Sequence, residues 1–140
     1  MVAAQKIAEV MGMKRTVRSL ADLSGAVVRG LPKSALRHCV DRVAASPQER
    51  RQLMFRVVPE ATFKRRRNQL KLEESERTER LARVIATAEY VWGDREEARR
   101  FLTTPHPELR DRRPLDAALT ELGARRVEEM LWSIFYGLPV

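Results

Sequence analysis

Four consecutive cations, Lys64 to Arg67, follow Phe63 in the stretch "ATFKRRRNQ" at residues 61–69. Lysine and arginine side chains gathered in this way bind anions, and the phosphates of nucleic acid are the first candidate. Consecutive residues on a helix point about 100° apart, so four in a row cannot all enter one groove of DNA. The row by itself is therefore compatible with two interpretations, a DNA-binding edge and a solvated basic surface.

The positive charge of the chain is concentrated in its first half. Residues 1–72 contain 16 Lys and Arg against 5 Asp and Glu, whereas residues 73–140 contain 11 against 14, and the formal net charge is +8. A sequence pI of about 10.5 favours an anionic partner, nucleic acid first and a membrane surface second. Because a uniformly basic protein would not divide in this way, we expect the first half to face nucleic acid and the second half to serve another role.

Residues that could carry catalysis or bind a metal are sparse. Cys39 is the only cysteine, and His38 and His106 are the only histidines, so neither a metal-ligand spacing nor a disulfide framework is present. No Ser/His/Asp or Cys/His arrangement is evident, and the acidic cluster at residues 73–79 lies at a predicted helix start, where the helix dipole already favours anions. We therefore expect a protein that is not an enzyme and that uses no metal and no cofactor.

The elements that position these side chains are predicted to be helices almost throughout. Only six Gly occur, strand-like alternation is hard to find, and Ala, Leu, Arg and Glu fill the periodic segments. No run approaches the roughly 18 apolar residues that a membrane span requires, so we expect neither an anchor nor a signal peptide and place the protein in the cytoplasm. The expected helices cover residues 5–11, 19–29, a segment from Pro32 to Val43, 46–57, a segment from Pro59, 73–92, a short segment after Asp94, and one after Gly123.

The best-specified helix start is "SPQE" at residues 46–49. Ser46 can cap, Pro47 suits the first helical position, and Glu49 can reach back to the Ser46 amide. After "RVV", Pro59 can begin a second helix that carries the cations, and two helices joined by a short turn are typical of a helix-turn-helix DNA reader. In that layout the first residues of the second helix meet base edges, and the cations behind them meet phosphates.

The second half of the chain ends in an apolar stretch. The loop "TTPHPELRDRRP", residues 103–114, carries three prolines, and its length favours a contact surface. Arg112 and Asp116 are candidates for an ion pair beside it. A last helix after Gly123 leads to "YGLPV" at residues 136–140, where solvated polar residues are the ordinary expectation. This apolar tail either folds back on the core or docks in a partner.

Residues 73–139 resemble the toxin-binding region of the Xre/MbcA/ParS antitoxins. The resemblance rests on "EESERTERLARV", "GDREEARRFL", the proline loop ending in "RPLD", and "GARRVEEML" leading to "YG". The stretch from Gly30 to Arg67 is similar in layout to the Xre-like helix-turn-helix portion of the same family. The resemblance implies an all-α protein, with an N-terminal Xre-like helix-turn-helix bundle at residues 1–70 and a small C-terminal helical toxin-binding domain at residues 71–140.

The resemblance also implies a function. Such antitoxins are homodimers that pair with a RES-domain toxin, which consumes NAD, cover its active-site cleft, and repress their own operon by binding operator double-stranded DNA. They act in the bacterial cytoplasm, at the nucleoid when bound to DNA. By position in the family pattern, the DNA-binding residues are Thr62, Lys64, Arg65, Arg66 and Arg67. The toxin-binding residues are Arg110, Arg112, Arg113, Arg126, Tyr136, Gly137, Leu138, Pro139 and Val140.

Other interpretations of these residues stay open. A stand-alone helix-turn-helix transcriptional repressor with a C-terminal dimerisation domain would explain the basic half, but it would leave the apolar tail without a role. Arg126 could pair with Glu129 as a helix neighbour. Trp92 and Trp132 could form a dimer interface among the C-terminal helices, or they could simply belong to the core.

Two departures from the family pattern bear on shape. Many relatives begin the long helix with "SPEES", whereas Lys71 and Leu72 stand at the capping places here. The cation-bearing helix could therefore run on toward the long helix, or it could join that helix through a less defined linker. Many relatives also carry Gly-Gly or Gly-Arg in the proline loop where Leu109, Arg110 and Asp111 stand, so the loop could differ in shape.

Overall fold

The computed structural model describes all 140 residues and contains nine α-helices, one 3-10 turn and no strand. The prediction of an all-α protein is confirmed. In chain order the elements are α1 (Ala4–Val10), α2 (Leu20–Arg29), α3 (Lys33–Val43), α4 (Pro47–Val57), α5 (Glu60–Arg65), α6 (Leu72–Trp92), α7 (Arg95–Thr103), η1 (Pro107–Leu109), α8 (Pro114–Ala117) and α9 (Glu121–Phe135).

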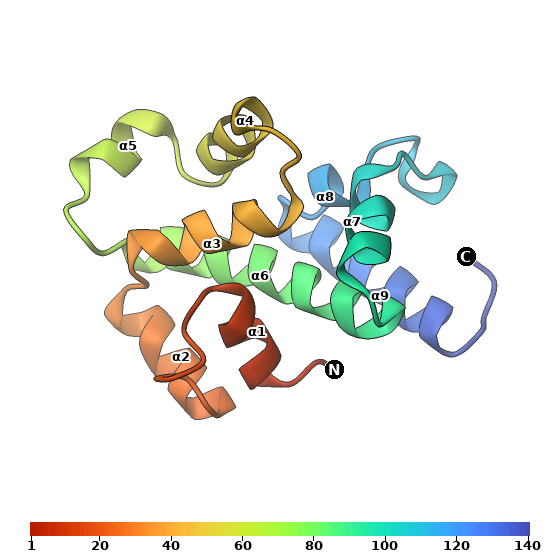
Figure 1. The fold of residues 1–140 in the computed structure, drawn as a ribbon, viewed down its shortest axis with the longest axis horizontal. Helices are drawn as coiled ribbons and strands as arrows, with labels where there is room; N and C mark the ends of the chain where they lie inside the picture. Colours follow the sequence, from red (N-terminus) through yellow and green to blue (C-terminus); the bar gives the residue numbers. More distant parts are fainter.

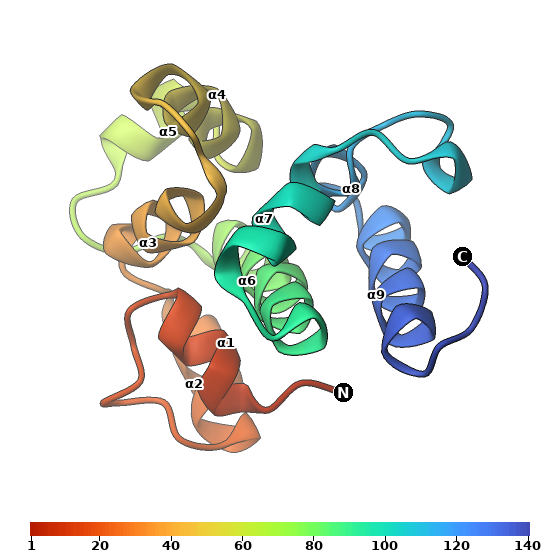
Figure 2. The ribbon, with the colours of Figure 1, turned by 45° about the vertical axis from the view of Figure 1, so that its right-hand side comes forward.

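The long helix α6 forms the centre of the fold. In Figures 1 and 2 it runs through the middle of the molecule, and it packs against α1, α2 and α3 as well as against α7 and α9. Its residues Leu81, Ala82, Val84 and Ile85 are at most 1% exposed. These four residues point in different directions around the helix axis. Helix α6 is therefore buried on several sides, as a central helix must be. None of the helices combines the length and the apolar character that crossing a lipid bilayer requires.

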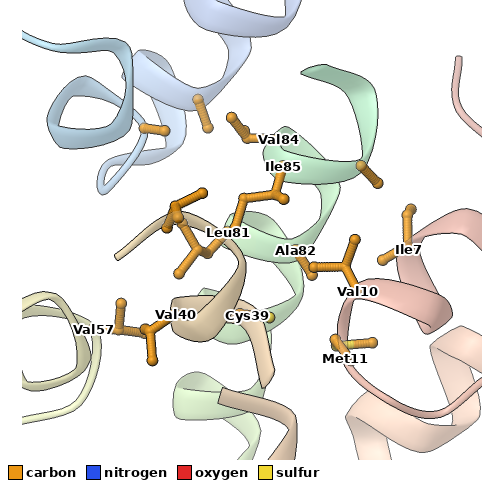
Figure 3. Close-up of a cluster of buried hydrophobic side chains, with 14 of the residues drawn as sticks. Ile7, Val10, Met11, Cys39, Val40, Val57, Leu81, Ala82, Val84 and Ile85 are labelled. Atoms are coloured by element: carbon orange, nitrogen blue, oxygen red, sulfur yellow. The ribbon is translucent and has the colours of Figure 1, made fainter. Parts of the chain in front are cut away.

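The first helix completes the core around α6. Figure 3 shows Ile7, Val10 and Met11 gathered near Ala82 of α6, with Cys39 of α3 close by. Each of these side chains is at most 2% exposed. They belong to one continuous cluster of 36 buried apolar residues that reaches into every helix of six or more residues. The chain before α2 is therefore part of the same core.

The segment from α4 to α5 has the predicted helix-turn-helix layout. Ser46 caps α4 by accepting a hydrogen bond from the Glu49 amide at 3.1 Å, and Pro47 takes the first helical position. The Glu49 carboxylate reaches one residue further back than expected and accepts from the Ala45 amide at 2.9 Å. Pro59 then immediately precedes α5. Satisfying the free amides of the first turn in this way fixes where α4 begins.

Helix α5 ends at Arg65 and does not continue into α6. Residues 66–71 cross the start of α3 instead, and the Leu70 amide donates to the carbonyl oxygen of Leu31 at 2.8 Å. Gly30 lies against this segment with φ 101°, and a Cβ there would collide with the carbonyl oxygen of Leu70. The possibility that the cation-bearing helix runs on toward the long helix is therefore wrong, because the linker is held in an extended path.

The ion pair beside the proline loop differs from the predicted one. Asp116 of α8 accepts hydrogen bonds from Arg113 at 2.8 and 3.0 Å, and a further one from Arg56 of α4 at 2.6 Å. Arg112 instead donates to the carbonyl oxygen of Leu109 at 3.3 Å. The expected Arg112–Asp116 pair is therefore wrong, because Arg113 lies three residues before Asp116 at the start of α8 and is the side chain within reach.

The last helix begins earlier than expected. Helix α9 starts at Glu121, where Thr120 caps it by accepting a hydrogen bond from the Gly123 amide at 3.0 Å. Gly123 therefore lies within the first turn of α9, and a Cβ there would collide with the carbonyl oxygen of Ala117. The glycine allows α8 and α9 to approach closely and is not a helix stop.

Candidate functional site

The exposed cations at the end of α5 are Lys64, Arg65 and Arg67. Lys64 Nζ lies 3.1 Å from the carboxylate of Glu60 one turn earlier, and this bond is the first cause that lowers the pKa of Glu60. Arg65 donates only to Thr62 Oγ1 at 3.4 Å, and neither Arg65 nor Arg67 takes part in an ion pair. Arg65 and Arg67 therefore carry the positive charge at the end of α5 that no carboxylate of the chain neutralises.

Arg66 is turned inward, away from its neighbours in the row. Its side chain is 17% exposed, and it donates to Glu74 of α6 through Nε at 2.9 Å and Nη2 at 2.6 Å. The same carboxylate accepts a hydrogen bond from the Lys71 amide at 2.9 Å. The Arg66 guanidinium, helped by this amide, lowers the pKa of Glu74 to about 2 against the opposing effect of burial. Arg66 thus ties the linker to the first turn of α6.

Phe63 fixes α5 beneath the exposed cations. It is 5% exposed and meets Phe55 of α4 edge to face, with ring centroids 6.0 Å apart. Lys33 Nζ lies 4.4 Å from the centroid of the Phe63 ring, and the Arg37 guanidinium lies 5.2 Å from it. These cation–π contacts bring two cations of α3 to the α5 surface. These two cations were not predicted to lie at this surface, because the only signal in the sequence is an aromatic residue about 30 positions away.

A second distinctive surface lies at the far end of α6 and α9. Tyr90 of α6 contacts Trp132 and Phe135 of α9, with ring centroids 5.8 and 5.6 Å apart, and Phe135 contacts Tyr136 at 5.2 Å. Tyr90 is 47% exposed, Phe135 45% and Tyr136 69%. We call these four side chains the aromatic cluster. Exposed aromatic side chains that gather in one place mark an interaction surface more often than an ordinary monomer surface.

The apolar tail continues the aromatic cluster and does not fold into the core. Gly137, with φ 70°, ends α9, and the Leu138 amide then donates to the carbonyl oxygen of Ser133 at 2.8 Å. Leu138 is 58% exposed and Val140 is 41% exposed. In Figure 1 this end of the chain stands clear of the helices. Of the two possibilities for the tail, packing on the core of its own chain is therefore wrong.

Two of the arginines assigned to this half hold the proline loop in place. Arg126 of α9 pairs with Glu108 of η1 at 2.7 Å, so the alternative pair with Glu129 is not formed. Arg113 is bound to Asp116, and this bond is the first cause that raises the pKa of Arg113. Both arginines are therefore already engaged within the chain.

Arg110 and Arg112 remain exposed at the tip of the proline loop. Arg110 and Asp111 adopt φ values of 56° and 61°, a left-handed conformation that side chains other than glycine rarely take. Two such residues in succession cost about 1 kcal/mol or more each, and His106 helps to offset this cost, since its carbonyl oxygen accepts from the Asp111 amide at 3.0 Å. The loop therefore takes the backbone shape that glycine would favour, although it contains none.

Neither half of the structure assembles a metal-binding site. No group of three or more His, Cys, Asp or Glu side chains lies close enough to hold a metal ion. Cys39 is fully buried, and burial raises the pKa of its thiol. A thiol in this state is neither a nucleophile nor a metal ligand, so Cys39 is a core residue.

Comparison with known proteins links both surfaces to one kind of system. The family model described as the antitoxin Xre-like helix-turn-helix domain matches residues 22–83. The family model described as the antitoxin Xre/MbcA/ParS C-terminal toxin-binding domain matches residues 87–137. A protein named Antitoxin Xre, from Pseudomonas putida, is 33% identical over 114 residues, which cover 79% of this chain and 69% of that protein. The two matched regions meet within α6, the helix that carries the common core.

Proposed function

The chain belongs to the family of Xre-type antitoxins, and from this membership we propose that it neutralises a cognate RES-domain, NAD-consuming toxin by covering the active-site cleft of that toxin. We also propose that it represses its own operon by binding operator double-stranded DNA. Both activities would take place in the bacterial cytoplasm, at the nucleoid when the protein is bound to DNA. The antitoxin has a helix-turn-helix domain and a toxin-binding domain, and we assign it no catalytic residue and no cofactor.

The DNA-binding role is assigned to residues 1–70. The start of α5, up to Thr62, is the part of the helix-turn-helix unit that would approach base edges, while Arg65, Arg67 and Lys64 would contact phosphates. We give Arg66 a positioning role, because its guanidinium is occupied by Glu74. A fixed linker lowers the entropic cost of presenting the neighbouring arginines to DNA.

The toxin-binding role is assigned to residues 71–140, and the observation that carries it is the exposure of the aromatic cluster together with the tail. Tyr136 and Leu138 are 69% and 58% exposed, so a partner could cover both. Aromatic side chains that become fully desolvated dominate the energy of protein interfaces. The tail residues Gly137, Pro139 and Val140 extend this surface, and Arg110 and Arg112 add cations to the same half of the chain.

A second candidate function is supported by the same aromatic cluster. If it joined two copies of the chain, the protein would be a stand-alone helix-turn-helix repressor with a C-terminal dimerisation domain. A homodimer is also part of the first proposal, since two copies of α5 would read two half-sites of an operator. The two proposals therefore differ only in whether a toxin competes for the C-terminal half.

The deciding experiment is co-expression with the toxin. We would express a RES-domain toxin encoded beside this gene, alone and with the antitoxin, and measure cellular NAD together with the mass of the purified complex. The proposal expects NAD to be preserved and the two proteins to purify together. If NAD falls equally with and without the antitoxin while both proteins are present, the antitoxin does not neutralise this toxin class. A DNA-binding dimer that ignores the toxin would favour the repressor function.

A further inference from the structure

The connection between α1 and α2 carries a second group of cations. Lys14, Arg15 and Arg18 follow Gly12 within seven residues, and all three side chains are exposed. None of them takes part in an ion pair, whereas six cations of the helix-turn-helix region are paired with carboxylates: Arg42, Arg50, Arg51, Arg56, Lys64 and Arg66. This connection also lies before residues 22–83, which the helix-turn-helix family model matches. No ion pair within the chain therefore accounts for these three charges.

The connection is held in one shape by its own contacts. The Val17 amide donates to the carbonyl oxygen of Met13 at 3.0 Å, and the Met13 amide donates to the carbonyl oxygen of Ala8 at 2.8 Å. Val17 is 2% exposed and Met11 is 1% exposed, so buried side chains anchor the connection at both ends. Cations presented by an ordered backbone lose less conformational entropy on binding than cations on a free arm.

A chain of contacts joins this connection to the α5 surface. The ring of His38 on α3 lies over Gly12 so closely that a Cβ on the glycine would be 2.9 Å from it. The next residue before it, Arg37, lies over the ring of Phe63 in α5. In Figures 1 and 2 α5 lies above α3 and the connection lies below it, so the two segments are on opposite edges of α3. The connection and α5 therefore flank α3, and each contacts one of two consecutive residues of that helix.

We propose that Lys14, Arg15 and Arg18 form a second contact with the phosphate backbone of DNA, which extends the footprint of the helix-turn-helix unit beyond the site read by α5. This inference rests on the proposed DNA-binding function. Phosphate is the ligand that fits, because the three side chains offer only donors and positive charge, and none of them makes a cation–π contact with an aromatic ring. The carboxylate of Asp22 accepts a hydrogen bond from the backbone amide of Arg18 at 3.0 Å, and the Asp22 amide donates to Ser19 Oγ at 3.0 Å. Asp22 forms no ion pair with these cations.

The proposal predicts a specific change in the salt dependence of DNA binding. Each phosphate contact contributes about −0.9 to the slope of log K against log salt concentration. The triple variant Lys14→Ala, Arg15→Ala, Arg18→Ala should therefore reduce the steepness of this slope by about 2 to 3 and weaken binding at least about tenfold at low salt. The probe is the DNA duplex directly upstream of the gene, titrated with full-length protein at several salt concentrations.

The matched control removes the same charge from the opposite half of the chain. Arg95, Arg100 and Arg125 are exposed, belong to neither proposed binding surface and are distant in sequence from the connection, so changing them to Ala lowers the net charge equally. A slope that falls only in the first variant supports the proposal. A slope that falls equally in both variants means that only net charge matters and overturns it, as does a first variant with the wild-type slope.

Failure of the underlying function is distinguishable from failure of this inference. A wild-type protein that does not bind the duplex overturns both, whereas a wild-type protein that binds and a triple variant that binds identically overturn only the second contact. The variant pair Lys14→Glu, Arg15→Glu gives a further readout, because repulsion from phosphate should weaken binding more than alanine does. Hydroxyl-radical footprinting should show the loss of protection at the edge of the bound site while the centre stays protected.

Discussion

Arg66 and Glu74 form an ion pair with two hydrogen bonds, Nε to Oε1 at 2.9 Å and Nη2 to Oε2 at 2.6 Å, across the linker between α5 and α6. The sequence resemblance assigned Arg66 to DNA binding together with Lys64, Arg65 and Arg67. Its partner is nearly buried, with a side chain 7% exposed, so the pair is a structural bond. It divides the basic row into a residue that positions α5 and residues that remain free to bind.

We expect the free energy of unfolding of the Glu74→Gln variant to be lower by about 2 kcal/mol at pH 7. The substitution removes the carboxylate that neutralises the partly buried Arg66 guanidinium. The folded pKa of Glu74 is lowered from 4.5 to about 2. Its stabilising effect is therefore complete above pH 4.5 and disappears as the pH falls to about 2. Urea unfolding between pH 7 and pH 2 measures this difference. The control is Glu73→Gln, an exposed neighbour without an ion pair; equal losses in both variants would contradict the role of the pair.

Changing Arg65 and Arg67 to Ala should weaken binding to operator DNA by at least about tenfold and reduce the steepness of the salt slope by about 2, since two phosphate contacts are lost. Thermal stability should stay unchanged, because both side chains are exposed and neither takes part in an ion pair. Arg66→Ala should show the opposite pattern, with lower stability as its main effect. Fluorescence anisotropy and thermal melting on the same samples separate the two cases. An Arg65/Arg67 variant that has a lower melting temperature but binds DNA normally would contradict the assignment of these two arginines to DNA binding and of Arg66 to positioning.

Removing residues 137–140 should release toxin activity and leave DNA binding unchanged. The deletion removes Leu138 and Val140, which are exposed in the free protein, and it leaves the buried core intact. Loss of an apolar anchor from an interface costs about 2 kcal/mol or more, which is about a thirtyfold loss of toxin affinity. NAD levels on co-expression and calorimetric titration with the toxin measure the change.

The control for the tail deletion is Leu122→Ala, which changes an apolar side chain that is 74% exposed at the opposite end of α9. It should neutralise like the parent protein. Full neutralisation by the truncated chain would show that the tail is not part of the contact with the toxin.

The sequence alone was sufficient to predict those features that depend on contacts between residues three or four positions apart. The cap at Ser46 falls into this class, because its side chain accepts a hydrogen bond from an amide three residues later. Relationships set by the tertiary fold could not be predicted in this way. Lys33 reaches Phe63 only because the linker after α5 crosses the start of α3, and no periodicity in the sequence encodes that crossing.

In the candidate site, too, features with a local signal could be predicted and features set by the tertiary fold could not. The apolar tail was recognised as unusual from residue type alone, since exposure at the end of a helix needs no distant partner. The contact between Tyr90 and Phe135, the residue directly before the tail, was not predicted, because it depends on how α9 lies along α6. The basic row was recognised too, but its division between binding and positioning residues depends on the extended linker that brings Arg66 to Glu74.

Asp116 offers a test of how the two halves of the chain are joined. It accepts two hydrogen bonds from Arg113 and one from Arg56 of α4, and the Arg113 bond is the first cause that lowers its pKa. Arg56 is 52% exposed, whereas Arg113 is 34% exposed, so water and salt screen the Arg56 pair more strongly. We expect double-mutant cycles to give a coupling of about 1 kcal/mol for Arg113–Asp116 and below about 0.5 kcal/mol for Arg56–Asp116.

Urea unfolding of the single and double alanine variants at low and high salt provides these couplings. The Arg56–Asp116 value should vanish at high salt, because exposed charges are screened within about a Debye length, and the two-bond pair should retain part of its value. If Arg56–Asp116 instead proves to be the stronger pair, α4 of the helix-turn-helix unit is tied firmly to α8. In that case, binding of a toxin to the proline loop would change the position of α4 and with it the affinity for DNA, since Asp116 would be bound both to Arg113 of the loop and to Arg56 of α4.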